Sequence, residues 1–511
     1  MLELCLHPFF SLSIIFSILV AQWRITRKKK VYPPGPKPLP VIGNLLDLPR
    51  EKEILTFHDW AKEYGEVVHV GLFGHHVLLV NSFDAATELL NRRSANYSDR
   101  MHLHMICDLM GWDWAFHMMP YGERWKKHRR FFDSYFRSGK ISKVWSVQTE
   151  KTHSLLQDLL EKPQEFLKHL KHASSSIIMK VTYGVDVAKS DDRFMSVADE
   201  AFDAMCKAAT PGAFLVDVLP FLKHVPEWFP GAAFQKQAKQ WKETTLEMRD
   251  APYQAVVEAM AKGKASPCFV SDCMNGKNEE DAQIVRNCAA LAFPAGSEST
   301  ETTLRAFFLA MCLFPEVQAK AQAELDGVCL GRLPEFSDRQ SLPYIDALCK
   351  ELLRWSPVAP LAVPHMATND DIYNGYFIPA GTIVLGNTWA ITHDENVYPD
   401  AWRFMPERYF TEDGQPSDVP DPALAAFGYG RRICPGRFMA DSELFIVVSS
   451  ILSTLQIKPG PTFKMPSELD GFKPDDYFTC GMVNHVKNFD CTVKPRSERA
   501  AGIIRNAQLQ H

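Results

Sequence analysis

The chain has 511 residues, of which 46% are hydrophobic and 23% are charged, and its formal net charge at pH 7 is −5. This is the balance of an ordinary globular protein. It lacks the basic excess typical of nucleic-acid-binding proteins, so we expect no nucleic-acid partner. The twelve cysteines form no CxxC pair and show no regular spacing, which argues against a disulfide framework and against a zinc site.

The first 23 residues have the pattern of a membrane anchor. Residues 4–23 are predominantly apolar, and a helix of that length spans about 30 Å, the thickness of the hydrocarbon core of a bilayer. Glu3 precedes this segment, and the positive charges of Arg24, Arg27 and residues 28–30 follow it. A cleaved signal peptide has the opposite order of charges. We therefore predict an anchor over residues 1–23, with the rest of the chain in the cytosol.

A basic and proline-rich segment, residues 24–44, follows the anchor. It contains the run PPGPKPLP at residues 33–40, and repeated prolines favour a stiff, extended backbone. Its place between an anchor and a globular body predicts a hinge that orients the body on the membrane, although a plain linker explains the composition as well. The remaining residues, 45–511, show no break in composition, and we expect them to form one large domain.

The apolar pattern of this domain is mostly helical. Residues at helical spacing predict helices over 300–314, 315–326 and 344–355, the first of them within a longer helical stretch that starts near residue 281. Apolar runs on both sides of Gly74 predict a β-hairpin of residues 67–72 and 77–80, and short strands are expected at 376–378 and 382–385. The polar stretch 262–280 predicts a loop. The expected fold class is mainly α with small β-sheets (α+β).

The strongest functional signal is the sequence FGYGRRICPG at residues 427–436. Its glycines permit tight turns and close approach to a bulky planar group, and such a loop can direct backbone N–H groups at the sulfur of Cys434. Arg432 offers a planar cation for a carboxylate, and Phe427 offers an aromatic surface. An apolar run after Gly436 predicts a helix whose N-terminal dipole favours a thiolate. Without this context, a lone cysteine is more often a buried structural residue.

The same ten residues resemble the haem-binding loop of the cytochrome P450 family, Phe-x-x-Gly-x-Arg-x-Cys-x-Gly, at every specified position. The resemblance, which extends over nearly the whole chain, implies a single large helical domain of the cytochrome P450 type. It implies haem b as the cofactor, Cys434 as the thiolate ligand of the iron, and haem contacts from Phe427, Arg432 and Gly436. A thiolate ligand pushes electron density onto iron and favours O–O cleavage.

Two distant segments match a structural cluster of this family. Glu351 and Arg354 lie three residues apart in a predicted helix, which places them on one face. On its own, this pair has the pattern of a surface ion pair worth about 0.2–0.5 kcal/mol. The resemblance adds Arg408, from the segment FMPERY at residues 404–409, and implies that the three side chains maintain the fold.

The resemblance also implies four donors to the two propionates of the haem. Trp125 and Arg129 lie at i and i+4 in a predicted helix, a spacing that an ordinary amphipathic helix explains equally well. His365 stands where the family usually has a propionate-binding His or Arg, and Arg432 belongs to the cysteine loop. Gathering these side chains has an electrostatic reason, because the haem carries two carboxylates.

The stretch AGSEST at residues 295–300 lies inside the long predicted helix. A glycine in mid-helix costs about 1 kcal/mol relative to alanine, and hydroxyl groups that bond back to the helix can bend it, so a simple kink is one interpretation. The resemblance implies another, a groove for O₂ beside an acid and an alcohol that deliver protons. Glu298 is the candidate acid. Because Ser299 stands where the family usually has Thr, both Ser299 and Thr300 are candidate alcohols.

The activity that the resemblance implies is a monooxygenase that hydroxylates a hydrophobic small molecule with O₂. No flavin or nicotinamide motif is visible, so electrons are expected from a partner, the NADPH–cytochrome P450 reductase of membrane-anchored relatives. The expected location is the endoplasmic reticulum membrane, single-pass and in contact with lipid, with the catalytic domain facing the cytosol. A basic docking face for the reductase is predicted, with solvated surface charge as the equal alternative, at Lys126, Lys127, Arg130, Arg431 and Arg437.

The substrate is the least specified part of the function. Residues 101–121, rich in methionine and aromatic residues, occupy the place of a substrate-contacting loop in the family and favour an adaptable apolar pocket; core packing explains each residue equally well. Residues 216–231 and 427–432 resemble basidiomycete enzymes of specialised metabolism, so we favour hydroxylation of a terpenoid. The alternatives are oxidation of a polyketide or an indole amine, a haem-thiolate isomerase or dehydratase that uses no O₂, and a non-catalytic haem-binding membrane protein.

Overall fold

The computed structural model describes residues 30–49, 51–210, 212–274, 276, 278–465, 474–479 and 481–507. The anchor predicted over residues 1–23 lies outside these residues and stays a prediction. Within the described residues, no helix combines the length and the apolar character needed to cross a membrane.

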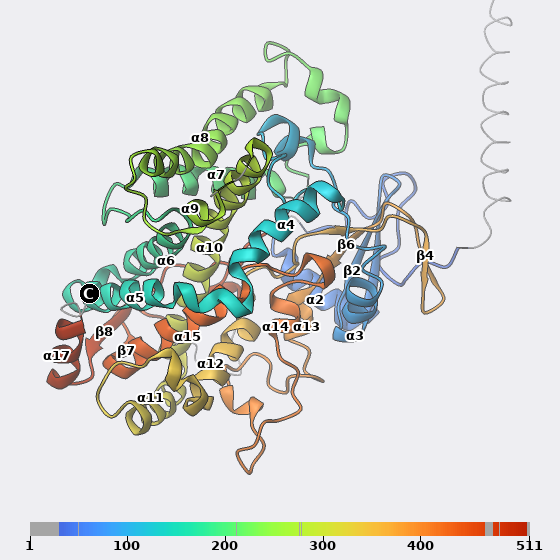
Figure 1. Cartoon of the computed structure of the whole chain (residues 1–511). Helices are drawn as coiled ribbons and strands as arrows, with labels where there is room; N and C mark the ends of the chain where they lie inside the picture. Colours follow the sequence, from blue (N-terminus) through green and yellow to red (C-terminus); the bar gives the residue numbers. More distant parts are fainter. Residues whose placement is uncertain are drawn as a thin grey trace, which may run out of the picture.

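Helices dominate the molecule, as the sequence predicted (Figure 1). The three predicted helical stretches fall at the end of α10 and within α11 and α12. Pro315 begins α11 directly after the end of α10, because a proline fits the first position of a helix and disfavours helical backbone at the residue before it. The α-helices are α2 (Glu53–Tyr64), α3 (Phe83–Ala86), α4 (Glu123–Phe136), α5 (Trp145–Glu161), α6 (Phe166–Tyr183), α7 (Arg193–Ala209), α8 (Ala233–Ala261), α9 (Phe269–Met274), α10 (Glu279–Leu313), α11 (Pro315–Cys329), α12 (Pro343–Trp355), α13 (Thr388–Thr392), α14 (Ala423–Ala426), α15 (Arg437–Thr454), α16 (Pro474–Tyr477) and α17 (Glu498–Ala507).

The described strands form three small sheets. A four-stranded sheet has the order β1-β2-β6-β3, and the pairs β4-β5 and β7-β8 stand apart from it. The predicted hairpin is confirmed as β1 and β2, which turn at Gly74 with a φ of 85°. The strands are β1 (Val67–Leu72), β2 (His75–Val80), β3 (His365–Met366), β4 (Asp371–Tyr373), β5 (Tyr376–Ile378), β6 (Ile383–Gly386), β7 (Leu455–Pro459) and β8 (Cys491–Pro495).

Two segments differ from their sequence-based interpretation. The described part of the predicted hinge lies against β1, where the carbonyl of Pro34 accepts a hydrogen bond from the N–H of His69 at 2.8 Å. A Cβ on Gly35 would lie 2.2 Å from the carbonyl oxygen of His69, so glycine permits this close approach. The predicted loop at 262–280 contains the short helix α9, because Phe269 and Val270 are buried in the core and hold it in place.

Helix α10 passes through two separate hydrophobic cores. Its first half packs with α4, α7, α8 and α9, and Phe293 is the last residue of α10 in that core. Its second half packs with α5, α11, α12 and α15, in a core that begins at Leu304. Between the two cores, residues 294–303 (PAGSESTETT) carry most of the polar side chains of the helix interior. The polar stretch singled out in the sequence therefore lies in the middle of the molecule.

Candidate active site

The loop that carries Cys434 folds back on itself and is fixed to its neighbours. The N–H of Cys434 donates to the carbonyl of Phe427 at 2.7 Å, which closes the loop. Gly430 has a φ of 53°, and its N–H donates to Oδ1 of Asn91 at 2.6 Å. A Cβ at this position would lie 2.1 Å from the carbonyl oxygen of Leu90, so the loop can approach that carbonyl only with glycine.

Backbone donors point at the sulfur, as the sequence predicted. The N–H groups of Gly436 and Arg437, where α15 begins, lie close enough to the sulfur of Cys434 to favour its thiolate form. Burial raises the pKa of the Cys434 thiol, whereas these N–H groups and the guanidinium groups of Arg129 and Arg437 lower it. In the structure burial outweighs these groups, so the pKa of the thiol stays raised, but the backbone N–H groups and the start of α15 are placed where they would favour a thiolate bound to a metal.

Two buried arginines lie beside this loop. Arg432 donates to the carbonyls of Ser98 and Met119, both at 2.7 Å. Its guanidinium carbon lies 4.6 Å from the centre of the Trp125 ring, a cation–π contact. Arg100, which the sequence analysis missed, donates to the carbonyls of residues 363 and 364. Burial lowers the pKa of Arg432 to about 10 and places that of Arg100 well below its usual value.

Two histidines share the surroundings of these arginines. His365, on β3, is buried and its Nδ1 hydrogen-bonds to the carbonyl of Tyr97 at 2.6 Å. Burial lowers the pKa of His365, and the charges of Arg100 and Arg432 lower it further. The same three causes lower the pKa of His117 to about 3, and its Nδ1 is a buried atom without a hydrogen-bond partner in the described part of the chain.

This cluster fits a ligand with carboxylates. In the part of the chain that the structure describes, Arg100 and Arg432 bond to backbone carbonyls and form no ion pair; Asp99 only partly offsets their charge. Uncompensated buried cations are costly, so their presence together indicates that an anionic group belongs here. The two propionates of a haem supply such charge, and the sulfur of Cys434 lies on the same loop as Arg432. The residues present therefore fit the cofactor that the sequence implied.

Of the remaining residues predicted to contact the cofactor, Arg129 bonds to other residues of the protein. Arg129 donates to the carbonyl of Ile433 at 2.6 Å and to Asp133 at 2.8 Å, so here it supports the cysteine loop. Trp125 is buried beneath Arg432, and Phe427 is half-buried at the end of α14. Trp125, Arg432 and His365 thus gather as predicted, whereas the contacts of Arg129 are with the protein.

The side chains in the polar stretch of α10 point to different sides of the helix. Ser299 is half-buried on the same side as the exposed Ala295, and its hydroxyl donates to the carbonyl of Ala295 at 2.7 Å. Thr300, the next residue, is buried. Gly296 faces α6, where a Cβ would lie 3.0 Å from Cγ1 of Ile178, so this glycine serves helix packing rather than an O₂ groove. Glu298 and Ser297 line a small hollow between α7 and α10 that has room for about one water molecule.

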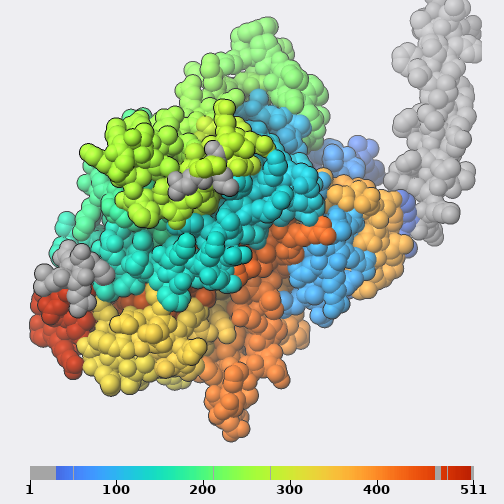
Figure 2. Space-filling view, viewed as in Figure 1, coloured from blue at the N-terminus to red at the C-terminus, as the bar shows by residue number. Residues whose placement is uncertain are grey.

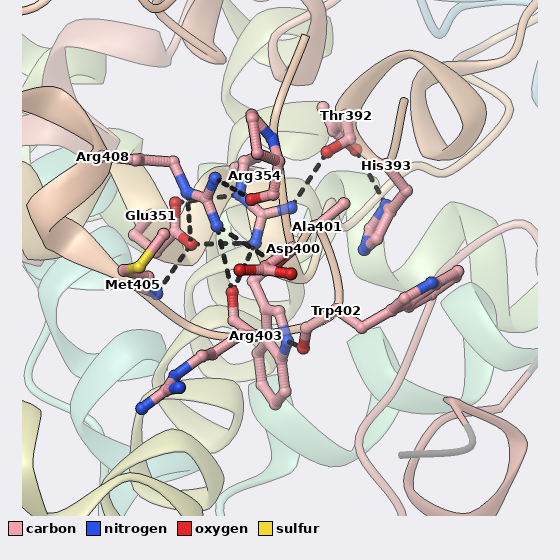
Figure 3. A network of polar contacts seen from close by, with 12 residues as sticks. Glu351, Arg354, Thr392, His393, Asp400, Ala401, Trp402, Arg403, Met405 and Arg408 are labelled. Atoms are coloured by element: carbon pink, nitrogen blue, oxygen red, sulfur yellow. Dashed lines mark hydrogen bonds and ion pairs between the residues drawn. The ribbon is translucent and has the colours of Figure 1, made fainter. Parts of the chain in front are cut away.

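The predicted structural cluster is confirmed (Figure 3). Arg354 forms two hydrogen bonds to the carboxylate of Glu351, at 2.8 and 2.9 Å, and all three side chains are buried. Arg408 donates to the same carboxylate at 3.1 Å. The arginines also bind the carbonyls of Thr392 and Arg403, which fixes the chain between α13 and residue 408 against α12.

Most of the large apolar side chains of the segment 101–121 are buried in a hydrophobic core. Seven of its large apolar side chains are buried in the same hydrophobic core as α4, α8 and α9, so packing explains them better than a substrate pocket does: Met105, Ile106, Met110, Trp112, Trp114, Phe116 and Met119. Arg100 precedes this segment and His117 lies within it, and Arg100 donates to the carbonyl of His117 at 3.1 Å. No local pattern marks them, because their other partners lie on the distant residues 363, 364 and 432.

Comparison with known proteins agrees with this geometry. A family profile described as Cytochrome P450 matches residues 33–479. The chain is 39% identical over 507 residues to Cytochrome P450 monooxygenase ple1 of Rhodocybe pseudopiperita, covering 98% of this chain and 96% of that protein. It is 40% identical to Cytochrome P450 monooxygenase COX2 of Coprinopsis cinerea, covering 93% and 91%. It is 36% identical to Tryptamine 4-monooxygenase of Psilocybe cyanescens, covering 96% and 97%.

Proposed function

Because this chain belongs to the cytochrome P450 family and is similar over nearly its full length to fungal monooxygenases, we propose that it hydroxylates a hydrophobic small molecule, with a terpenoid scaffold favoured. The haem of the family, bound through a cysteine thiolate, supplies the activation of O₂. The observation that carries the proposal is the Cys434 loop, which places two backbone N–H groups near the sulfur and a buried guanidinium without an ion-pair partner, that of Arg432, two residues before it.

The chain's own residues have three tasks in this reaction. Arg100, Arg432, Trp125 and His365 would hold the propionates of the cofactor. Glu298 and Ser299 would hold and relay protons along the polar stretch of α10. The two hydrophobic cores on either side of residues 294–303 keep bulk water away from that stretch.

Electron supply by a flavoprotein reductase is part of the proposal. Lys127 and Arg130 on α4 have side chains that are 48% and 69% exposed, and they form surface ion pairs with Glu280 and Glu123. α4 lies against the cysteine loop, since Arg129 bonds to Ile433, and Figure 2 shows this cyan helix at the surface beside the orange loop. Surface ion pairs are weak, so these cations remain able to attract an acidic partner.

Membrane association is supported by exposed apolar side chains as well as by the predicted anchor. Leu215, Phe221, Trp228 and Phe229 are more than half exposed. They lie in the segment before α8, within the green projection at the top of Figure 2. Large apolar side chains clustered in one exposed segment mark a contact with a partner or a membrane. We propose that this segment touches the lipid surface of the endoplasmic reticulum.

The second candidate substrate class is an indole amine. The relative from Psilocybe cyanescens, which is 36% identical to this chain, is named for tryptamine. The hollow beside α10 is too small to hold an aromatic ring, so this candidate class rests on the relative alone. A haem-thiolate isomerase is disfavoured, because the polar stretch of α10 retains the acid and the alcohol that a reaction with O₂ needs.

The proposal is tested on the full chain co-expressed with an NADPH-dependent reductase. The reduced, CO-bound spectrum is expected to show thiolate ligation, and Cys434→Ala is expected to abolish it, whereas Cys206→Ala on α7 leaves it unchanged. Products are then analysed with terpenoid, polyketide and indole-amine precursors, with and without O₂. An O₂-independent product would establish the isomerase alternative, and retention of the thiolate spectrum in Cys434→Ala would refute the assignment of the ligand.

A further inference from the structure

We infer that His485 is a positioning residue for Glu298, and that it forms the solvent side of the path by which protons reach α10. The inference rests on the proposed monooxygenase function, which requires protons. It comes from one juxtaposition: the segment near the C-terminus that contains His485 lies against the polar middle of α10. Nothing in the sequence around residue 485 marks it for this role.

The geometry places one imidazole nitrogen between two side chains of α10. Nδ1 of His485 lies 3.3 Å from Oε1 of Glu298 and 3.3 Å from Oγ1 of Thr302. Glu298 and Thr302 are four residues apart, and residues at this spacing lie on the same face of a helix. His485 therefore contacts the α10 face that carries the candidate acid.

The backbone holds His485 in this place. Its N–H donates to Oγ1 of Thr479 at 3.1 Å, and its carbonyl accepts from the N–H of Thr479 at 2.8 Å. The N–H of Asn484, the preceding residue, donates to the carbonyl of Val358 at 2.9 Å. These bonds fix the turn on both sides of the imidazole, so the position of the ring does not depend on its contact with Glu298.

Most of the other charged groups around Glu298 are paired with one another. Lys171 on α6 binds Asp199 on α7 at 2.6 Å, and Arg305 binds Glu301 at 2.6 Å, both on α10. Asp203 on α7 also acts on Glu298 and His485. Among the side chains that the structure describes, His485 is the one base within ion-pair distance of Glu298.

The pKa shifts of Glu298 and His485 favour transfer of a proton between them. Burial raises the pKa of Glu298 and lowers that of His485, which brings the two values closer together. Proton transfer between groups of similar pKa has a small energetic cost. The side chain of His485 is 37% exposed and that of Glu298 is 19% exposed, so His485 is the member nearer to water. His485 takes a proton from water and passes one from Nδ1 to Oε1 of Glu298; no electrons move.

The first test uses His485→Asn, because asparagine keeps a hydrogen-bonding group near the position of Nδ1 but does not titrate. In the holoenzyme with reductase and substrate, we expect the fraction of NADPH electrons recovered as product to fall roughly 3- to 10-fold, less than the factor of about 10²–10⁴ for a residue that transfers the proton to the reacting group itself. We also expect this fraction to lose its pH dependence over the range in which His485 titrates. His75→Asn, on the exposed end of β2, is the matched control.

The second test does not depend on turnover. In the reduced, CO-bound holoenzyme, which is diamagnetic, the ring of His485 is titrated by NMR in the wild type and in Glu298→Gln. Loss of the carboxylate is expected to lower the titration midpoint by about one pH unit, because an opposite charge at this distance favours the imidazolium. Equal midpoints, or unchanged coupling in His485→Asn, would overturn the inference. Failure of the proposed function is seen separately, as a wild type that forms no O₂-dependent product.

Discussion

Ser299 and Thr300 are adjacent on α10 but have different surroundings. The hydroxyl of Ser299 bonds back to Ala295 on a partly open face, whereas Thr300 is buried. We therefore expect Ser299→Ala to lower the yield of product per NADPH by about 100-fold and to raise the release of hydrogen peroxide, because proton delivery fails. Thr300→Ala should change the yield by less than about 2-fold, as it is off the path. The reverse order of the two effects would assign the alcohol to Thr300.

Arg100 is the second residue whose role can be tested alone. Its guanidinium is buried and bonds only to backbone carbonyls among the described residues. If it compensates a haem propionate, Arg100→Met is expected to weaken haem retention by about 10-fold or more, since a hydrogen bond to a charged group contributes about 1.5–3 kcal/mol. The measurement is haem transfer to excess apomyoglobin. Arg124→Met, an exposed cation on α4, should retain haem like the wild type.

Single residues also show where the sequence stopped being informative. Cys434, Arg432 and Gly436 lie within one ten-residue loop, so a local pattern could identify them together. Arg100 is placed by hydrogen bonds from its guanidinium to the carbonyls of residues 363 and 364, and His485 by a bond between its neighbour Asn484 and the carbonyl of residue 358. Such contacts exist only in the folded chain. Arg129 matched its pattern, yet its described partners are Ile433 and Asp133.

In the cysteine loop, the role of Gly430 can be tested with Gly414, a glycine outside the loop, as the control. Both have left-handed backbones, with φ of 53° and 73°, but a Cβ on Gly414 meets nothing within 4 Å, whereas one on Gly430 meets the carbonyl of Leu90. Gly414→Ala should cost only the roughly 1–2 kcal/mol of this backbone conformation. Gly430→Ala should cost more and also reduce haem content, because the loop must move. Equal unfolding free energies in urea would contradict this.

The three-residue cluster on α12 is the second test at this level. Glu351 compensates both Arg354 and Arg408 where all three are buried. Glu351→Gln leaves two buried cations without a carboxylate, so the free energy of unfolding is expected to fall by about 3–5 kcal/mol. The control is Glu165→Gln, which breaks an exposed pair with Lys168 at the same i,i+3 spacing. That change should cost less than about 0.5 kcal/mol, and a comparable loss in both would mean that burial does not matter here.

Helices and strands could be predicted where the spacing of their own apolar residues determined them. The hairpin of β1 and β2 and the helices α10, α11 and α12 follow from apolar spacing. The short helix α9 does not, because six residues have no clear period and burial of Phe269 stabilises it. The role of the apolar segment 101–121 could not be decided from its composition. Methionine and aromatic residues suit a pocket and a core alike, and the neighbouring helices decide in favour of the core.

For the whole molecule, the arrangement of charge predicts how electrons arrive. The Cys434 loop contacts α4 through Arg129, and Lys127 and Arg130 are exposed on the same helix, so a reductase that docks on α4 would be close to this loop. Attraction between exposed charges is screened within about 8–10 Å at moderate salt. NADPH oxidation at limiting reductase is therefore expected to fall as ionic strength rises.

Reversing these charges should mimic the effect of salt. In Lys127→Glu/Arg130→Glu, the reductase concentration needed for half-maximal turnover is expected to rise by about 10-fold, with little change at saturation, because charges at the rim of an interface act mainly on association. Lys494→Glu, an exposed cation on β8, is the matched control and should behave like the wild type. If both variants lose the same amount, net charge rather than this face governs the encounter. If the α4 variant is unchanged and salt has no effect, the reductase binds elsewhere.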